Sequence, residues 1–137
     1  MSQQQLDQLF SSSPAGPIPN GQARGTAIIA PGTTYSQDIA EVINIFAWQG
    51  KVFDAAHGRL VNLITPLGIN AIVADVYVGP SWLDDKDCVV LDYSKTSTLA
   101  HWIRDEIREI APSFYLGIVY WGKKRLINFS LDFSPSS

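Results

Sequence analysis

The stretch FYLGIVYWGKKRLINFSLDF, residues 114–133, decides the fold that the sequence predicts. Both of its ends are rich in aromatic and β-branched residues, and the turn sequence GKK lies between them at 122–124. Toward the C-terminal end, Ile127, Phe129 and Leu131 alternate with polar residues, which is the period of a strand with one buried face. A glycine followed by polar residues between two such runs is typical of a hairpin. We therefore predict two antiparallel strands, at 114–121 and 125–133.

Runs of the same kind precede this hairpin along the chain. Segments 51–54 and 59–65 flank AAHG at 55–58, which predicts a second hairpin. Three more strands are predicted, at 22–30, 69–78 and 88–93. Because short connections join these strands and βαβ spacing is absent, we predict a mainly β fold, an antiparallel barrel or half-barrel of about seven strands. A barrel of this size either fills its interior with side chains or holds one small ligand.

Two helices are predicted to cover an end or an edge of this barrel. Thr34 and Gln37 have the spacing of a capping box, and apolar residues then repeat at three and four positions, which predicts a helix over 35–47. A second apolar stripe predicts a helix that ends near Ile110 or Ala111, because Pro112 disfavours helical geometry at the residue before it. The residues of this stripe are Leu99, Ile103, Ile107 and Ile110.

The domain organisation follows from composition. Residues 1–21 are rich in Gln, Ser, Pro and Gly and are predicted to form a flexible N-terminal arm, in which 2–10 can form one or two helical turns. Residues 22–137 are predicted to form a single barrel domain, since a chain of 137 residues is close to the commonest size of one domain.

Charge and composition also restrict the function. The net charge is -3 and the only cluster of Lys and Arg lies in the predicted turn, so we expect no binding to nucleic acid. We expect no membrane insertion, because no apolar run approaches the roughly 20 residues that span a bilayer. The lone Cys88 cannot form an internal disulfide, which agrees with a cytoplasmic protein. With two separate histidines and no phosphate-binding glycine motif, we expect no metal and no cofactor.

Three segments carry a resemblance to a known fold group. DYS at 92–94, IRDEIREIAP at 103–112 and YLG at 115–117 resemble a pattern of small bacterial proteins with lipocalin-like (calycin-like) β-barrels. Gly25, WQGK at 48–51 and Asn62 belong to the same pattern. The resemblance covers about two thirds of the chain, and RDEIR is its distinctive part. It implies a barrel with an interior pocket and brings no established catalytic residues.

Polar residues of the second predicted helix are candidates for chemistry. His101 and Asp105 would share one side, where they could exchange protons, and Arg104 would lie at the margin of the apolar stripe, where it could hold a ligand carboxylate. The alternative is a solvated helix face with ion pairs. Asp75 and Asp92 lie in apolar strands, and each would be a structural anchor that is paired with another side chain. Alternatively, Asp75 would act as a general base and Asp92 would bind a polar group of the ligand.

Aromatic residues form the last group of candidates. Most of them are explained by core packing, but several could instead line a pocket, with Trp82 in a lid after Gly79 and Pro80. Together the predicted catalytic residues are Asp75, His101 and Asp105. The predicted ligand-binding residues are Arg104, Trp48, Tyr77, Trp82, Asp92, Tyr93, Tyr115 and Tyr120.

Three functions fit these patterns. The leading one is binding of a small apolar molecule with a carboxylate or hydroxyl inside the barrel. The alternative is a cofactor-free isomerase, cyclase or lyase that moves one proton of a hydrophobic substrate in the same cavity. A purely structural or partner-binding domain is the third, and the sequence does not decide the oligomeric state.

Overall fold

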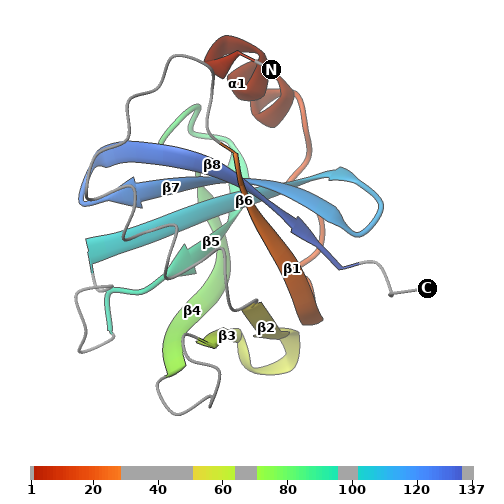
Figure 1. Cartoon of the computed structure of the whole chain (residues 1–137), viewed down its shortest axis with the longest axis vertical. Coiled ribbons are helices and arrows are strands. Elements are labelled where there is room, and N and C mark those ends of the chain that lie inside the picture. The colour runs from red at the N-terminus through yellow and green to blue at the C-terminus, as the bar shows by residue number, and fades with distance from the viewer. Residues whose placement is uncertain (1, 29–50, 64–70, 96–101, 134–137) are drawn as a thin grey trace.

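The computed structural model describes residues 2–28, 51–63, 71–95 and 102–133, in which eight strands and one α-helix are formed (Figure 1). Each strand pairs antiparallel with the next, and β1 pairs with β8, so the sheet closes into a barrel. Before β1 lies the helix α1, at Gln3–Ser11. The strands are β1 (Gly21–Ile28), β2 (Lys51–Asp54), β3 (Arg59–Leu63), β4 (Ala71–Pro80), β5 (Asp87–Asp92), β6 (Ile103–Ala111), β7 (Phe114–Trp121) and β8 (Lys124–Asp132).

The predicted antiparallel barrel is confirmed, with eight strands in the described residues where about seven were expected. The hairpin of β2 and β3 turns through a 3-10 helix at Ala55–His57, and Gly58 ends it in the left-handed conformation with φ 61°. The hairpin of β7 and β8 turns at Gly122, whose φ is 60°. Glycine adopts positive φ without steric cost, which is why both turns contain it.

The helix predicted over the stripe from Leu99 to Ile110 is wrong for the part that the structure describes, because Ile103–Ala111 is the strand β6. Ile103 and Ile107 fit a period of two as well as a period of four, and they point into the barrel together with Asp105. Isoleucine also favours strands. Glu106 and Arg108 occupy the other face, where neighbouring segments bury and pair them. The predicted helix over 35–47 lies outside the described residues.

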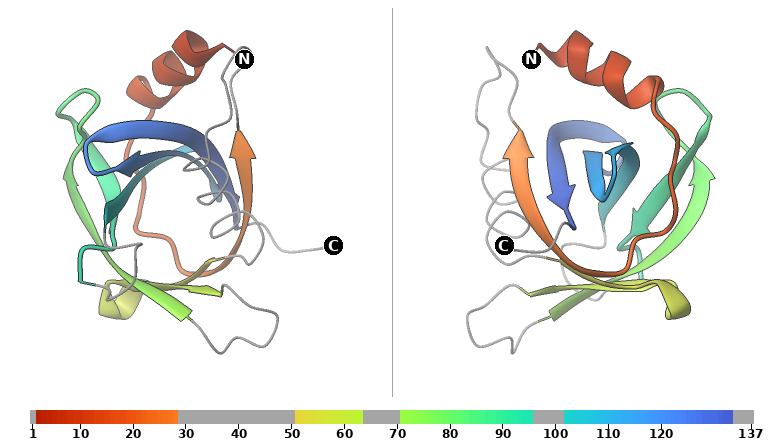
Figure 2. Two further views of the ribbon diagram at one scale, coloured as in Figure 1. Left: turned by 60° about the vertical axis from the view of Figure 1, so that its left-hand side comes forward. Right: turned by 90° about the vertical axis from the view of Figure 1, so that its right-hand side faces the viewer.

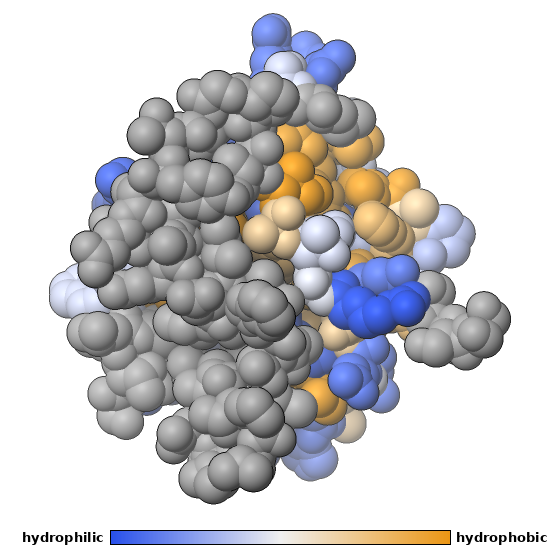
Figure 3. Space-filling model, in the orientation of Figure 1, coloured by the Kyte–Doolittle hydropathy of each residue, from blue (hydrophilic) through white to orange (hydrophobic). Residues whose placement is uncertain are grey.

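Both faces of the sheet, the one inside the barrel and the one outside it, carry a cluster of buried apolar residues. The interior contains the larger apolar cluster, which includes Leu60, Leu91, Ile107 and Phe129. On the outer face, α1 lies across the barrel (Figure 2), and its Leu6 and Phe10 are buried. They pack in a second apolar cluster with Cys88, Val90, Leu116, Ile118 and Tyr120. In the orientation of Figure 1, hydrophobic residues reach the surface just below α1 (Figure 3).

The segment between α1 and β1, residues 14–20, runs along the edge of one end of the barrel (Figure 2). The carbonyl of Pro14 accepts a hydrogen bond from the Glu109 backbone N–H, and that of Pro17 accepts one from the Tyr115 hydroxyl at 2.7 Å. Ile18 packs against the interior cluster, and the Asn20 side chain accepts from the backbone N–H of Ala55. These contacts run from the β6–β7 turn to the β2–β3 turn, so the segment is fixed to this end of the barrel. The arm boundary at residue 21 stays a prediction.

Candidate functional site

The described part of the barrel interior is mainly apolar, but it holds one compact group of polar side chains. Lys51 begins β2, Tyr93 follows β5, and Asp105 is the third residue of β6. Lys51 is 1% exposed and Asp105 is 0% exposed. The Nζ of Lys51 donates a hydrogen bond to the Tyr93 hydroxyl at 3.1 Å and lies 3.9 Å from Oδ2 of Asp105. We call these three residues the interior triad.

Pairing of the strands explains how the triad is assembled. Alternation places Lys51 on the same face of β2 as Phe53, and Asp105 on the same face of β6 as Ile103 and Ile107. Each of the three residues lies near the end of its strand that is opposite to residues 14–20. The triad is therefore near one end of the barrel, while the N-terminal segment lies at the other.

The carboxylate of Asp105 lacks hydrogen bonds. Neither of its oxygens has a donor among the described residues, and both are buried. At 3.9 Å, the Lys51 ammonium is near enough for an ion pair but too far for a hydrogen bond. Buried carboxylates are normally hydrogen-bonded, because an unsatisfied charged group in an apolar interior costs several kcal/mol, on the order of 2–7 even for a neutral polar group. The carboxylate is thus an acceptor that the described chain leaves open.

Burial shifts the proton affinities of this pair in opposite directions. Desolvation raises the pKa of Asp105 from 3.8 to about 7, although the charge of Lys51 opposes this shift. Desolvation lowers the pKa of Lys51 from 10.5 to about 7, against the attraction of Asp105. A dry interior disfavours the charged form of each group, so the two pKa values converge near neutrality. One proton can therefore be held by the pair and exchanged within it near pH 7.

The outer face of β6 carries charges of another kind. Glu106 is fully buried, and its Oε1 accepts a hydrogen bond from the Ser81 hydroxyl at 2.6 Å. Its Oε2 accepts from the backbone N–H of Trp82 at 2.8 Å and from Arg104 at 3.1 Å and 3.2 Å. Arg104 also donates to the carbonyl of Pro80 and stacks on the Trp82 ring, 4.3 Å from its centroid. These bonds tie the β4–β5 hairpin to β6.

Arg108 is the second buried charge on this outer face. It forms a two-bonded pair with Asp84 at 2.6 Å and 2.7 Å, which lowers the pKa of Asp84 to about 2. It also donates to the carbonyls of Phe10, Lys86 and Asp87. One guanidinium thereby joins α1 and the β4–β5 hairpin to the barrel.

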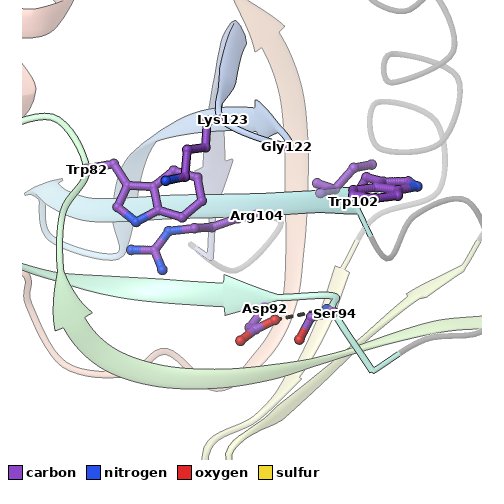
Figure 4. Close-up of a pocket in the computed structure, with 8 residues that line it drawn as sticks. Trp82, Asp92, Ser94, Trp102, Arg104, Gly122 and Lys123 are labelled. Carbon is purple, nitrogen blue, oxygen red and sulfur yellow. Dashed lines mark hydrogen bonds between the residues drawn. The ribbon is translucent and has the colours of Figure 1, made fainter.

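A groove of about 340 Å³ lies on the outside of the barrel (Figure 4). Trp82 and Trp102 are 47% and 54% exposed there, and the side chain of Arg104 lies beside the Trp82 ring. Asp92 accepts hydrogen bonds from Ser94 and from the Tyr77 hydroxyl. Burial favours a higher pKa of Asp92, but these hydrogen bonds together lower it. The Arg104 and Asp92 side chains both have partners within the chain.

The structure separates the residues that the sequence singled out. Asp105 and Tyr93 are inside the barrel, and Tyr115 is also inside, bonded to Pro17. Asp75 is on the outer face, paired with Lys95 at 3.1 Å. On the outer side of the barrel are Arg104, Trp82, Asp92, Tyr77 and Tyr120, of which Trp82 and Tyr120 meet edge to face at 5.1 Å. Trp48 and His101 lie outside the described residues.

Sequence reasoning did not select Lys51 as a site residue. One signal for it was present: in the predicted hairpin, Lys51 and Phe53 are two residues apart and must share a face. Since Phe53 is a core residue, its face points inward, and Lys51 points inward with it. A lysine on the apolar face of a short strand is therefore the pattern that would have revealed it.

Comparison with known proteins supports the fold. A crystal structure of a protein from Thermomonospora curvata is similar to this chain, with a TM-score of 0.67 and 16% sequence identity. The likeness covers 98% of this chain and 89% of that one, and at this identity it shows the fold alone. No family model matches the sequence, and no curated protein matches it. In the described residues, no helix is long and apolar enough to cross a membrane.

Proposed function

We propose that the protein binds a small, mainly apolar molecule inside its barrel and holds the polar group of that molecule at the interior triad. The observation that carries this proposal is the buried Asp105 carboxylate, which has no hydrogen-bond donor among the described residues. A ligand hydroxyl or N–H would supply the missing donor, and the Lys51 ammonium would hold the oxygen of a hydroxyl or carboxylate.

The surroundings of the triad suit an apolar ligand body. Small residues occupy the inward positions of β1 beside Lys51, since Ala23 pairs directly with it and Ala27 follows on the same face. Phe129 and Tyr93 present aromatic rings 6.0 Å and 5.7 Å from the Lys51 ammonium. Apolar walls with a few convergent polar groups are the usual composition of a small-molecule site.

The finer classification belongs to the same proposal. We assign the barrel to the lipocalin-like group on the resemblance of residues 92–117 and on the eight antiparallel strands. We also propose a cytoplasmic location, on the basis of the lone Cys88, and no membrane insertion, since no apolar run approaches roughly 20 residues. The net charge of -3 supports the proposal that the protein does not bind nucleic acid.

Calorimetric titration with matched ligands tests the proposal. Decanol and its methyl ether differ in the hydroxyl proton that would be donated to Asp105. We expect decanol to bind about tenfold or more tightly than the ether, as a hydrogen bond to a charged group contributes about 1.5–3 kcal/mol. Asp105→Leu should remove this preference. Asp75→Asn is the matched control, because Asp75 lies on the outer face.

The panel should extend to fatty acids, retinoids and aromatic acids, since the triad also contains a cation. If no compound of the panel binds to the parent protein, the proposal fails. If compounds bind equally well to the parent and to the Asp105→Leu variant, binding occurs elsewhere and the assignment to the triad fails.

A second candidate is a cofactor-free isomerase, cyclase or lyase, which the convergence of the two pKa values near 7 favours. A general base works best when its pKa is near the operating pH. Asp105 would remove a proton next to a carbonyl, and Lys51 and Tyr93 would hold the carbonyl oxygen. Of the other predicted catalytic residues, Asp75 faces outward and His101 lies outside the described residues.

Proton exchange tests this candidate without a known substrate. Apolar ketones would be incubated in D₂O with the parent protein, and loss of the α-proton signal would be followed by NMR. We expect exchange to be faster with the parent and with Asp75→Asn than with Asp105→Asn. Equal rates for the parent and Asp105→Asn would contradict it.

A further inference from the structure

We propose that Lys51 is a covalent attachment site, which forms an imine with the carbonyl carbon of an apolar aldehyde held in the barrel. This inference rests on the proposed function, since it names one class of ligand for the same site. The observation behind it is the position of the buried Lys51 amine between the Asp105 carboxyl and the Tyr93 hydroxyl.

The geometry around the amine carries the proposal. The side chain of Lys51 is inside the barrel, where its Nζ lies 3.1 Å from the Tyr93 hydroxyl and 3.9 Å from Oδ2 of Asp105. Imine formation needs a nucleophilic amine and a group that can give and take protons beside it. In the triad, Lys51 is the amine and Asp105 is the group that can give and take protons, and the apolar cluster surrounds them.

The amine must be neutral before it can attack a carbonyl. An ordinary lysine with a pKa near about 10.4 is almost fully protonated at pH 8 and reacts slowly. Burial lowers the pKa of Lys51 to about 7, so most of it is neutral at that pH. Desolvation of a lysine in a hydrophobic pocket is a known route to an activated amine nucleophile.

The reaction balances with the groups that are present. The neutral Lys51 nitrogen adds to the carbonyl carbon, and the Asp105 carboxylate carries one proton from this nitrogen to the carbonyl oxygen, which gives a neutral carbinolamine. Asp105 then takes one proton from solvent and gives it to the hydroxyl, which leaves as water while the C=N bond forms. The sum is amine plus aldehyde plus one proton giving protonated imine plus water, with no oxidant or reductant. The protonated imine keeps one positive charge, which the Asp105 carboxylate balances.

Reductive trapping tests the inference in the full-length parent protein. The protein would be incubated with decanal below stoichiometric amounts at pH 8, treated with sodium cyanoborohydride, and mapped by peptide mass spectrometry. We expect Lys51 to be alkylated about ten to a hundred times faster than Lys123 or Lys124, because burial leaves most of the Lys51 amine neutral at this pH. The two exposed turn lysines are internal controls in the same sample.

Variants separate the role of each group. Asp105→Asn keeps the amine but removes the proton donor, and it should slow alkylation of Lys51. Lys51→Arg should abolish the interior adduct while the exposed lysines react as before. Because Lys51→Arg alters a buried residue, its fold would be checked by circular dichroism, and the comparison of lysines within the parent does not depend on it.

Comparing decanol with decanal distinguishes the imine inference from the proposed function. If decanol binds to the triad but decanal is trapped evenly over the exposed lysines, the imine inference is wrong and the proposed function stands. If neither compound binds inside the barrel, both are wrong. Selective alkylation of Lys51 that Asp105→Asn slows is the result that supports the inference.

Discussion

The two faces of β6 bury charged side chains in opposite ways. On the outer face, Glu106 and Arg108 are both 0% exposed, and each has several hydrogen bonds to surrounding segments. On the inner face, Asp105 is equally buried, yet neither of its oxygens has a donor among the described residues. Only three positions separate these residues in the sequence, so the local sequence alone does not explain the difference.

The comparison shows how structural and functional charges can be told apart. A buried charge with all its hydrogen bonds made is held in one state and joins elements of the fold. A buried charge without hydrogen bonds lowers the stability of the folded state, so its presence indicates a role other than stabilising the fold. We therefore interpret the outer charges as parts of the fold and the inner one as part of a site.

The largest effect is expected from Arg108→Met, which removes the charge that joins α1 and the β4–β5 hairpin to the barrel. Asp84 and the carbonyls of Phe10, Lys86 and Asp87 would lose the hydrogen bonds that the guanidinium donates. Removing one partner of a buried ion pair costs about 3–5 kcal/mol. Urea unfolding should show a loss of this size in the free energy of unfolding.

A surface pair gives the matched control for this prediction. Arg24 and Asp132 also form an ion pair, but their side chains are 60% and 36% exposed. Arg24→Met should cost about 0–1 kcal/mol, as exposed pairs do. If both substitutions cost the same, the outer face of β6 does not hold the fold together as proposed.

A smaller effect of the opposite sign is expected on the inner face. Replacing the pair by apolar residues, as Lys51→Met with Asp105→Leu, should raise the free energy of unfolding by about 1–4 kcal/mol, as such replacements often do. The same double variant should lose its preference for decanol. If it is less stable than the parent at pH 7, the inner pair supports the fold and the contrast between the two faces disappears.

The pH dependence sharpens this prediction. The pKa of Asp105 is raised from 3.8 to about 7, so the folded state binds the extra proton and the parent loses stability as pH rises through this interval. The pKa of Lys51 is lowered from 10.5 to about 7, so the parent regains stability as pH rises from there. The pair costs most near pH 7. The gain of the double variant should therefore be largest there and smaller at about pH 4 and pH 10.

The smallest effect is expected from Tyr77→Phe, outside the barrel. The Tyr77 hydroxyl donates to Asp92 at 2.8 Å and is one of the groups that lower the pKa of this carboxyl. Without it, the pKa of Asp92 should rise toward its ordinary value, which NMR titration of the carboxyl carbon would measure. The pKa of Asp105 should stay unchanged, because Asp92 faces outward. A change in Asp105 would show that the two faces are coupled.

Much of the fold could be predicted because, for most strands, the alternation of apolar residues and the positions of the turn residues indicate the same strand. The hairpins of β2 with β3 and of β7 with β8 have alternating apolar residues and a glycine turn, and both were predicted. The strand β6 was missed since its charges interrupt the alternation, and Ile103 and Ile107 also fit a helix. Only the tertiary partners of Glu106 and Arg108 make a strand with two buried faces possible.

The candidate site was predictable only in part. Asp105 and Tyr93 were selected from the sequence, but on a helical argument for Asp105 that the strand replaces. Arg104 lies next to Asp105 in sequence and was expected to anchor a ligand, whereas alternation turns it to the other face, where Glu106 holds it. Lys51 comes from a strand that is distant in the sequence, and its approach to Asp105 depends on closure of the barrel.

Residues 14–20 lie at one end of the barrel, and the interior triad lies near the other. Since Ile18 packs against the interior cluster at this end, we expect a molecule held at the triad to enter and leave by the other end, beside Lys51. A second molecule would then reach the triad from the same end by which the first must leave. Exchange of bound ligands should then proceed at the pace of departure, whatever the concentration of the newcomer.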